Sequence, residues 1–439
     1  MTLTEAPPSR PPGPPPPAVP EPEPSPRAAL VRLGVIVAGA VVAAVALGVA
    51  KTVAVIAAIV AMIMLHELGH FATAKWSGMK VSEYFLGFGP RLWSVRRGET
   101  EYGIKAIPAG GYVKILGMSN LEEVDPAEER RTYRAASFPR RLGVASAGSL
   151  VHFLIALVLL WVLLAVAGTV SYSNPVVGSL TKFPASESPA QQAGLHLGDR
   201  ILAIDGRPVS SWSQLPPFIQ AHADQRVVLT VDRGRQVLQV PVTPIDLVRD
   251  HIPGVPVQVP AGDRSFGFIG IGVGPTVVRE GPLAAVRDAG SDFARTVGDV
   301  FGALGQVFSR QGLNTYTSQI TGHLPASTAG AAQPRFESVV GIVYLANDAA
   351  TSGLRDVLAL LIELNVFIGI FNLLPLLPLD GGHVVIAAYE RLRSRRGRPY
   401  RADIRKWIPV TYAVLACLLV IALASTWADI FHPPPNPFQ

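Results

Sequence analysis

The sequence predicts a polytopic α-helical membrane protein with four core transmembrane helices, a cytosolic β-hairpin and an α+β domain outside the membrane. Three observations lead to this fold class. The mean hydropathy is +0.34 and only 16% of the 439 residues are charged, which is too apolar for an ordinary soluble protein. Apolar runs close to the roughly 20 residues that span a bilayer recur along the chain. Basic residues gather between these runs, as a positive-inside bias requires.

The N-terminal part contains a polar tail followed by apolar residues. Residues 1–28 are rich in proline and cannot bury a core, so they are predicted to be a disordered tail. An apolar run at 29–50 is interrupted by Lys51 and resumes over 52–74. Two helices joined by a tight turn are one interpretation, which adds a fifth transmembrane helix. A single overlong helix is the other, and the sequence leaves both open.

The run 52–74 contains a motif that predicts a metal site, His66-Glu67-Leu68-Gly69-His70. Two histidines four residues apart project from one helical face and can hold the same metal ion. Glu67 lies close enough to accept a proton from an attacking water. Ionisable groups at membrane depth are costly and persist mainly where they line a site. Because Cys417 is the only cysteine, zinc ligands must be His, Asp or Glu.

Residues 91–117 change from helical to strand signals. The β-prone runs 92–95 and 102–107 flank a turn at Gly98-Glu99, and a Pro/Gly-rich break precedes Tyr112–Ile115. Such a hairpin could offer its edge to an extended peptide, with an ordinary surface hairpin as the alternative. This segment is predicted to be cytosolic, and the metal site to open toward the cytosol, because of its basic residues: Lys75, Lys80, Arg91, Arg96, Arg97, Lys105 and Lys114.

A further transmembrane helix is predicted at 143–168. His152 within it is interpreted as a buried polar contact between helices, with a ligand role as the alternative. Residues 171–245 then form a soluble unit. Within it, Ser188–Val209 couples a short helix to a strand and a tight turn. This run resembles a PDZ domain, which by that likeness holds a peptide in a groove beside a strand. Residues 246–355 are predicted to be a second extracytoplasmic region, with helical spacing at 283–308.

The next transmembrane helix, 357–382, contains its own break. Pro375 and Pro378 free backbone groups, which is tolerated at membrane depth only where the chain lines an enclosed site. Asp380 follows where a third metal ligand would be useful. Residues 389–406 are predicted to be a cytoplasmic basic loop, better explained by topology and anionic lipid than by nucleic acid. The last transmembrane helix is predicted at 407–430.

The paired motifs, His66-Glu67-x-x-His70 and Leu379-Asp380-Gly381-Gly382, resemble the site-2 protease family of intramembrane zinc metalloproteases. The actinobacterial branch with one PDZ domain is the most similar, and the likeness covers about residues 52–430. It implies Zn²⁺ bound by His66, His70 and Asp380, with Glu67 as the general base. It also implies a membrane re-entrant β-loop. The residues expected to contact substrate are Asn372, Pro375, Gly111, Tyr112, Val113 and Lys114.

Two positions depart from the family pattern. Leu377 stands at the second proline of Asn-x-x-Pro-x-Pro, although the spacing from Asn372 to Asp380 is kept. In the second span, the family's Gly-Pro-x-x-Asn reads Gly148-Ser149-Leu150-Val151-His152. This second departure weakens the case for a substrate-positioning role of that element.

The likeness implies an endopeptidase of the bacterial cytoplasmic membrane that cuts within or next to the transmembrane segment of single-pass proteins. Anti-sigma factors or remnant signal peptides are the implied substrates, with the bilayer and a peptide at the PDZ domain as further partners and no nucleic acid. The competing class is a non-enzymatic membrane scaffold or metal-dependent chaperone, in which zinc is fully coordinated and Glu67 is dispensable. A transporter is less favoured, because the chain shows no internal repeat.

Overall fold

The structure, a computed structural model, describes residues 26–118, 122–183, 186–252, 264–307, 337–394 and 400–433, with a few isolated residues between and after these ranges. The chain divides into two compact units. Unit 1 comprises Met1–Val151 and Asn372–Cys417, and unit 2 comprises His152–Phe371 and Leu418–Gln439. Most of the predicted proline-rich tail and five residues of the basic loop, 395–399, lie outside the described residues.

The N-terminal apolar run forms two helices. Helix α1 covers Pro26–Ala46 and α2 covers Ala50–Trp76, with Gly48 in the left-handed region (φ 71°) between them. The two-helix interpretation is therefore the one that the structure bears out. The apolar part of α1, Leu30–Ala46, is shorter than the roughly 20 residues that cross a bilayer.

Among the described residues, three helices are long and apolar enough to span a membrane: Ala50–Trp76, Phe138–Ala167 and Arg405–Phe431. Helix α3 (Phe138–Val162) begins the second of these, and its last turn, Leu163–Ala167, is a π-turn. The third consists of a short 3₁₀ turn, Ile404–Trp407, and α12 (Ile408–Phe431). The expected four core spans are thus not all recovered.

The expected helix at 357–382 is two helices. Helix α10 (Leu354–Asn372) ends before Pro375, and α11 (Asp380–Arg393) begins after Pro378. The break agrees with the two prolines, neither of which can continue an α-helix. Helix α10 is not among the three candidate spans, because three charged residues lie within its 19 residues: Arg355, Asp356 and Glu363.

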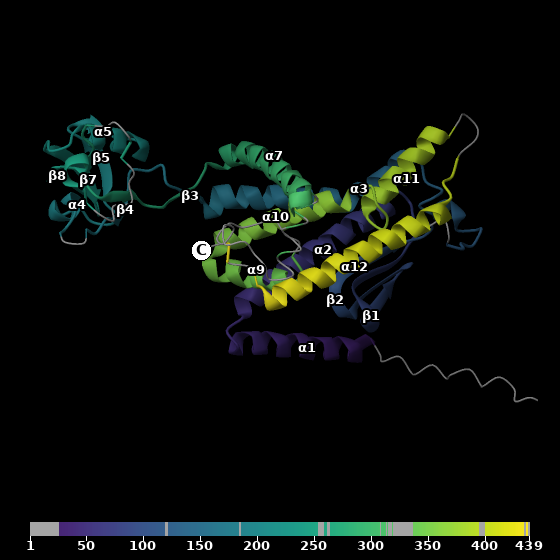
Figure 1. Cartoon of the computed structure of the whole chain (residues 1–439). Coiled ribbons are helices and arrows are strands. Elements are labelled where there is room, and N and C mark those ends of the chain that lie inside the picture. The colour runs from purple at the N-terminus through teal and green to yellow at the C-terminus, as the bar shows by residue number, and fades with distance from the viewer. Residues whose placement is uncertain are drawn as a thin grey trace, which may run out of the picture. The chain divides into compact units, whose positions relative to one another are not determined.

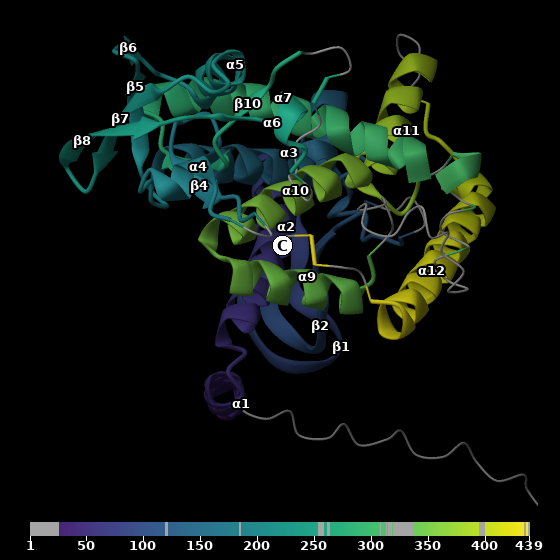
Figure 2. The same cartoon turned by 60° about the vertical axis from the view of Figure 1, so that its left-hand side comes forward.

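The β-hairpin is longer than expected. Strands β1 (Val81–Arg97) and β2 (Thr100–Ile115) form an antiparallel pair that begins ten residues before the predicted start at 91. Gly87 and Gly89 adopt positive φ, and this interrupts the alternation by which a strand is recognised. Residues 83–86 have partners in two stretches of β2, so that Tyr84 lies opposite both Tyr102 and Val113. The long strands consequently curve beside α2 (Figures 1 and 2).

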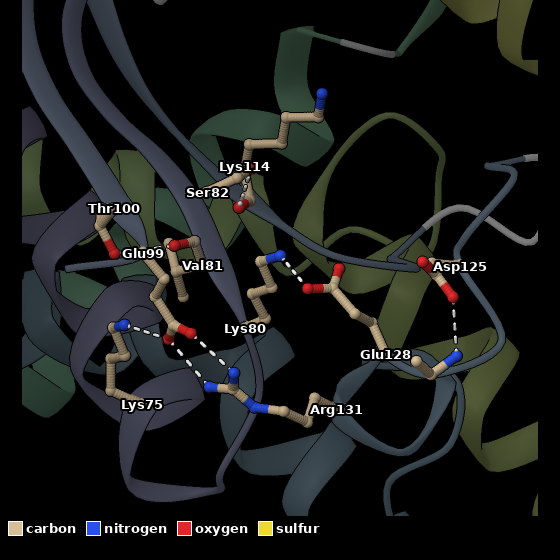
Figure 3. A network of polar contacts seen from close by, with 11 residues as sticks. Lys75, Lys80, Val81, Ser82, Glu99, Thr100, Lys114, Asp125, Glu128 and Arg131 are labelled. Carbon is tan, nitrogen blue, oxygen red and sulfur yellow. Dashed lines mark hydrogen bonds and ion pairs between the residues drawn. The ribbon is translucent and has the colours of Figure 1, made fainter. Parts of the chain in front are cut away.

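The turn of the hairpin is fixed by ion pairs (Figure 3). The Glu99 carboxylate accepts hydrogen bonds from Lys75 Nζ, at the end of α2, at 2.5 Å and from Arg131 Nη2 at 2.9 Å. Thr100 Oγ1 donates to the Val81 carbonyl at 2.7 Å, and Lys80 pairs with Glu128. The Lys75–Glu99 pair ties the turn to the helix that carries the two histidines.

The Glu99 clamp should make the hairpin sensitive to acid. Hydrogen bonding from Arg131, then from Lys75, holds the pKa of Glu99 at about 2, below its ordinary 4.5. Because this pKa is depressed by folding, the stabilisation is full above about pH 4.5 and is lost as pH falls toward 2. In the parent protein, the hydrogen exchange rate of the backbone amides of residues 98–100, corrected for intrinsic rates, should therefore rise as the pH falls from about 4.5 toward 2. Glu99→Gln should show fast exchange throughout, and an unchanged profile would contradict the clamp.

Unit 2 contains a strand-rich body with a four-stranded sheet in the order β6-β5-β7-β8 (Figure 2). Its core is built from aliphatic side chains, including Ile201, Leu215, Leu229 and Val231. Its elements are β4 (Val177–Leu180), α4 (Pro189–Gln192), β5 (Arg200–Ile204), β6 (Arg207–Pro208), α5 (Leu215–Ala221), β7 (Val227–Arg233), β8 (Gln236–Val242), β9 (Ile245–Asp246), α6 (Leu247–Asp250), β10 (Gly267–Phe268) and β11 (Ile271–Val273).

This body extends beyond the expected boundary at residue 245. Strand β10 pairs with β9, and β11 pairs with β4, so the chain returns to the body as far as Val273. Strands β3 (Thr169–Ser171) and β12 (Thr276–Val278) pair next to it. An apolar cavity of about 180 Å³ lies between α5 and residues 266–273.

Helix α7 (Pro282–Val307) packs against two other helices of unit 2. Its apolar face meets the end of α3 and α10, where Leu160, Ala285, Ala289 and Ile362 are buried together. Helix α9 (Val339–Ser352) is capped by the Ser338 hydroxyl. The expected helical spacing at 283–308 therefore corresponds to one continuous helix.

Candidate metal centre

Three potential metal ligands converge in unit 1. His66 and His70 lie one turn apart on α2, and Asp380 is the first residue of α11. His70 Nε2 is 3.2 Å from His66 Nε2 and 3.1 Å from Asp380 Oδ2, and His66 Nε2 is 3.4 Å from Asp380 Oδ2. Within the described part of the chain, this is the one group of three His, Cys, Asp or Glu side chains that could hold a metal ion.

The spacing of the three donor atoms fits a zinc ion. Donors at the corners of a tetrahedron, with bonds of about 2.0–2.2 Å, lie roughly 3.3–3.6 Å apart. The observed separations of 3.1–3.4 Å are close to this range. Two histidines and one carboxylate are also a donor set that zinc accepts, and catalytic zinc sites use three protein ligands where structural sites use four.

A backbone carbonyl fixes the orientation of one imidazole. His70 Nδ1 lies 2.7 Å from the carbonyl oxygen of Val144 on α3. A carbonyl can only accept, so Nδ1 carries the proton and the lone pair of Nε2 points toward the other two donors. His66 and His70 are both buried, which keeps their rings in place.

Gly148 on α3 has no side chain, and the imidazoles of His66 and His70 occupy the space where one would lie. A Cβ atom at this position would lie 2.4 Å from His66 Cε1 and 2.4 Å from His70 Nε2, too close for any side chain. Gly69 is similar, because its Cβ would lie 3.0 Å from the Ala147 carbonyl oxygen. Helices α2 and α3 therefore approach closely at the metal centre. Sequence analysis considered Gly148 only as part of a motif that departs from the family pattern. It did not predict that this glycine makes room for the two imidazoles.

Glu67 lies between the two histidines and beside β2. Its carboxylate lies near the backbone N–H of Val113. A Cβ at Gly111 would lie 3.3 Å from Glu67 Cγ and 2.7 Å from Met64 Sδ. The structure therefore brings two of the expected substrate-contacting residues, Gly111 and Val113, next to the expected general base.

The other expected contact residues point elsewhere or lie in the turn before Asp380. The Tyr112 hydroxyl bonds Glu83 and Lys105, and Lys114 Nζ is 3.9 Å from Glu83. Asn372 ends α10, and Pro375 lies in the turn between α10 and α11. This turn is tight, because a Cβ at Gly381 would lie 2.2 Å from the Leu373 carbonyl oxygen. The glycine after Asp380 thus lets the turn pack on the start of α11.

His152 lies in unit 2 and makes a contact between helices. Its Nδ1 is 2.8 Å from Asn365 Oδ1 on α10, and both residues are buried. Asn365 in turn donates to the Leu361 carbonyl at 2.7 Å. The expectation that His152 is a buried polar contact is confirmed.

Comparison with known proteins agrees with this geometry. The model of peptidase family M50 matches residues 54–419. The zinc metalloprotease Rip1 of Mycobacterium tuberculosis is 35% identical over 399 residues, which cover 84% of this chain and 95% of the relative. Rip1 of Mycolicibacterium smegmatis is 32% identical, with the same coverage of both chains. A putative zinc metalloprotease of Rhizobium meliloti is 29% identical, covering 84% of this chain and 93% of its own.

The chain belongs to peptidase family M50, the site-2 proteases. It is a zinc metalloprotease and, with its three candidate spans, a membrane protein whose substrates are membrane proteins.

Proposed function

We propose that this chain is an endopeptidase that hydrolyses a peptide bond within or next to the transmembrane segment of single-pass membrane proteins. His66, His70 and Asp380 hold the zinc ion, and Glu67 is the general base. The observation that carries this proposal is the convergence of the three donors, with Glu67 beside them, where two of the donors lie on a helix apolar enough to span a membrane.

The zinc ion, Glu67 and the Val144 carbonyl have separate roles in the proposed hydrolysis. Zinc bound there supplies a Lewis acid that activates water and polarises the carbonyl of the scissile bond. Glu67 accepts a proton from the attacking water and delivers it to the leaving amine. The Val144 carbonyl keeps His70 in the tautomer that offers Nε2 to the metal.

The stretch Gly111–Lys114 of β2 is the proposed docking strand for the substrate. A helical substrate must unwind before cleavage, and its freed backbone groups then need partners. Residues 111–115 pair with β1 on one side, while the Val113 N–H points to Glu67 on the other. An added strand on this side would lie next to the general base. Asn372 and Pro375, by likeness to the family, help to position it.

The proposed topology has four core spans, with α10 as the fourth despite its charges. Lys75 lies in the last turn of α2 and Lys80 follows it, and Arg391 and Arg393 lie in the last turn of α11. By the positive-inside rule, these ends are placed in the cytosol of a bacterium. The metal centre then opens to the cytosolic side, and the strand-rich body is extracytoplasmic. This body is proposed to be a PDZ domain whose groove filters access, with anti-sigma factors or remnant signal peptides as substrates.

Metal analysis combined with cleavage tests the proposed function. The purified parent should contain about one zinc per chain and should cut a co-expressed single-span substrate within or next to its span, as located by product mass. His66→Ala and Asp380→Ala should lose both properties. His222→Ala, in the strand-rich body, is the control and should keep them. Zinc content unchanged in both ligand variants would refute the assignment.

Proline substitutions test the docking strand. Because the Val113 N–H faces Glu67, the N–H groups of Tyr112 and Lys114 face β1. Val113→Pro should therefore keep the hairpin and the zinc but reduce cleavage of a helical substrate at least tenfold. Tyr112→Pro should instead disrupt the pairing with β1. Val113→Ala, which keeps the N–H, is the control. Cleavage at the parent rate in Val113→Pro would show that the strand does not dock substrate.

A further inference from the structure

We propose that the buried ion pair between Arg141 and Glu390 positions Asp380, and that both are positioning residues for the metal centre. The inference rests on the proposed function, because it assumes that Asp380 is a metal ligand. Arg141 lies in the first turn of α3, and Glu390 lies in the last turn of α11, the helix that begins with Asp380.

The pair is short, buried and formed between distant parts of the sequence. Arg141 Nη1 lies 2.6 Å from Glu390 Oε2, and the two side chains are only 12% and 5% exposed. The other oxygen of Glu390 accepts the N–H of Ala402 at 2.7 Å. Both oxygens of Glu390 are therefore engaged, and the end of α11 is held by α3 and by the segment that precedes the last helix.

One face of α3 contacts both histidines and the last turn of α11. Arg141, Val144 and Gly148 are separated by three and four residues, so they follow one another along the same face. They contact, respectively, Glu390, the His70 ring through the carbonyl, and the space filled by both imidazoles. The same helix surface thus orients the two histidines and anchors the helix that carries the third ligand.

Aromatic packing continues this anchor toward the ligand. The Arg141 guanidinium lies over the Tyr133 ring at 5.1 Å, and the Tyr133 ring meets the His383 ring edge-on at 6.3 Å. His383 lies one helical turn after Asp380 on α11. Contacts therefore run along α11 from its last turn to the turn that contains the ligand.

Asp380 needs such an anchor because of where it lies. It is the first residue of α11, and Leu379 before it provides no side-chain cap. First turns fray readily, since their N–H groups have no partners within the helix. The preceding turn, with Pro375 and Pro378, is not helical, and its backbone hydrogen bonds, such as Leu379 N–H to the Leu376 carbonyl at 2.9 Å, do not involve the Asp380 carboxylate. The remainder of α11, fixed at Glu390, sets the direction in which Asp380 points.

The test measures zinc affinity and kinetics in Glu390→Gln and Arg141→Gln. Each should raise the zinc dissociation constant, measured by chelator competition, at least roughly tenfold. At saturating zinc, kcat should fall while KM for the substrate stays within about twofold. The visible spectrum of the Co²⁺-substituted protein should change, which a purely structural role away from the metal would not cause.

A matched control is offered by the ion pair between Asp199 and Arg233 in the strand-rich body. It has the same 2.6 Å length, and Asp199 is 1% exposed. Arg233→Gln should lower the melting temperature of that body but leave zinc affinity, the Co²⁺ spectrum and kcat on a short substrate unchanged.

The outcomes separate this inference from the proposed function. A parent protein without zinc or cleavage would refute the proposed function itself. An active parent, with Glu390→Gln and Arg141→Gln at parental zinc affinity and kcat, would refute only the positioning role. If these variants fail to fold, Glu390→Asp keeps the charge and shortens the reach by one carbon. It should show a smaller loss of zinc affinity, and parental affinity there would equally overturn the inference.

Discussion

Glu67→Gln is expected to abolish proteolysis while leaving zinc bound. The substitution keeps the size of the side chain and an oxygen near the Val113 N–H, but removes the group that takes the proton from water. General-base catalysis typically accelerates a reaction by about 10²–10⁴-fold, so kcat should fall by at least about 100-fold. Zinc should remain near one per chain, because the three converging donors belong to His66, His70 and Asp380.

A surface acid of unit 1 provides the control for this experiment. Glu128 pairs with Lys80 near the hairpin, and Glu128→Gln makes the same chemical change without touching the metal centre (Figure 3). It should cleave at the parent rate. A Glu67→Gln protein that still cleaved at that rate would remove Glu67 from the mechanism and require another base.

The histidine pair could be predicted from sequence because its geometry is local. Residues four apart share a helical face whatever the rest of the chain does. Asp380 is 310 residues from His70, so spacing alone could not place it. It was reached from the proline break and from the family likeness, and the structure brings its carboxylate to the two histidines.

Features that depend on contacts between elements could not be predicted. A glycine in an apolar helix, such as Gly148, indicates close packing but not which group it packs against. The start of β1 at Val81 was missed because glycines interrupt its alternation. The end of the strand-rich body was missed because β10 and β11 contain only two and three residues, too few for a pattern.

Gly148→Ala is expected to lose zinc although alanine normally favours a helix. Replacing glycine by alanine in a helix interior stabilises it by roughly 0.5–1 kcal/mol when the space is open. At Gly148, the new Cβ would lie 2.4 Å from atoms of both metal-binding imidazoles. Either the rings turn away from Asp380, or α3 moves and the Val144 carbonyl leaves His70. Both outcomes should raise the zinc dissociation constant by about 10–100-fold, with activity lost in parallel.

Gly143 on the same helix is the matched control, because a Cβ there would meet nothing within 4 Å. Gly143→Ala should therefore keep parental zinc and cleavage, and should melt at the same or a slightly higher temperature. Both variants add one methyl group to α3, so any difference between them arises from the position alone. Chelator competition and substrate cleavage on the two proteins give the comparison. If Gly148→Ala bound zinc as tightly as Gly143→Ala, the close approach of α3 to the imidazoles would not be a requirement of the metal centre.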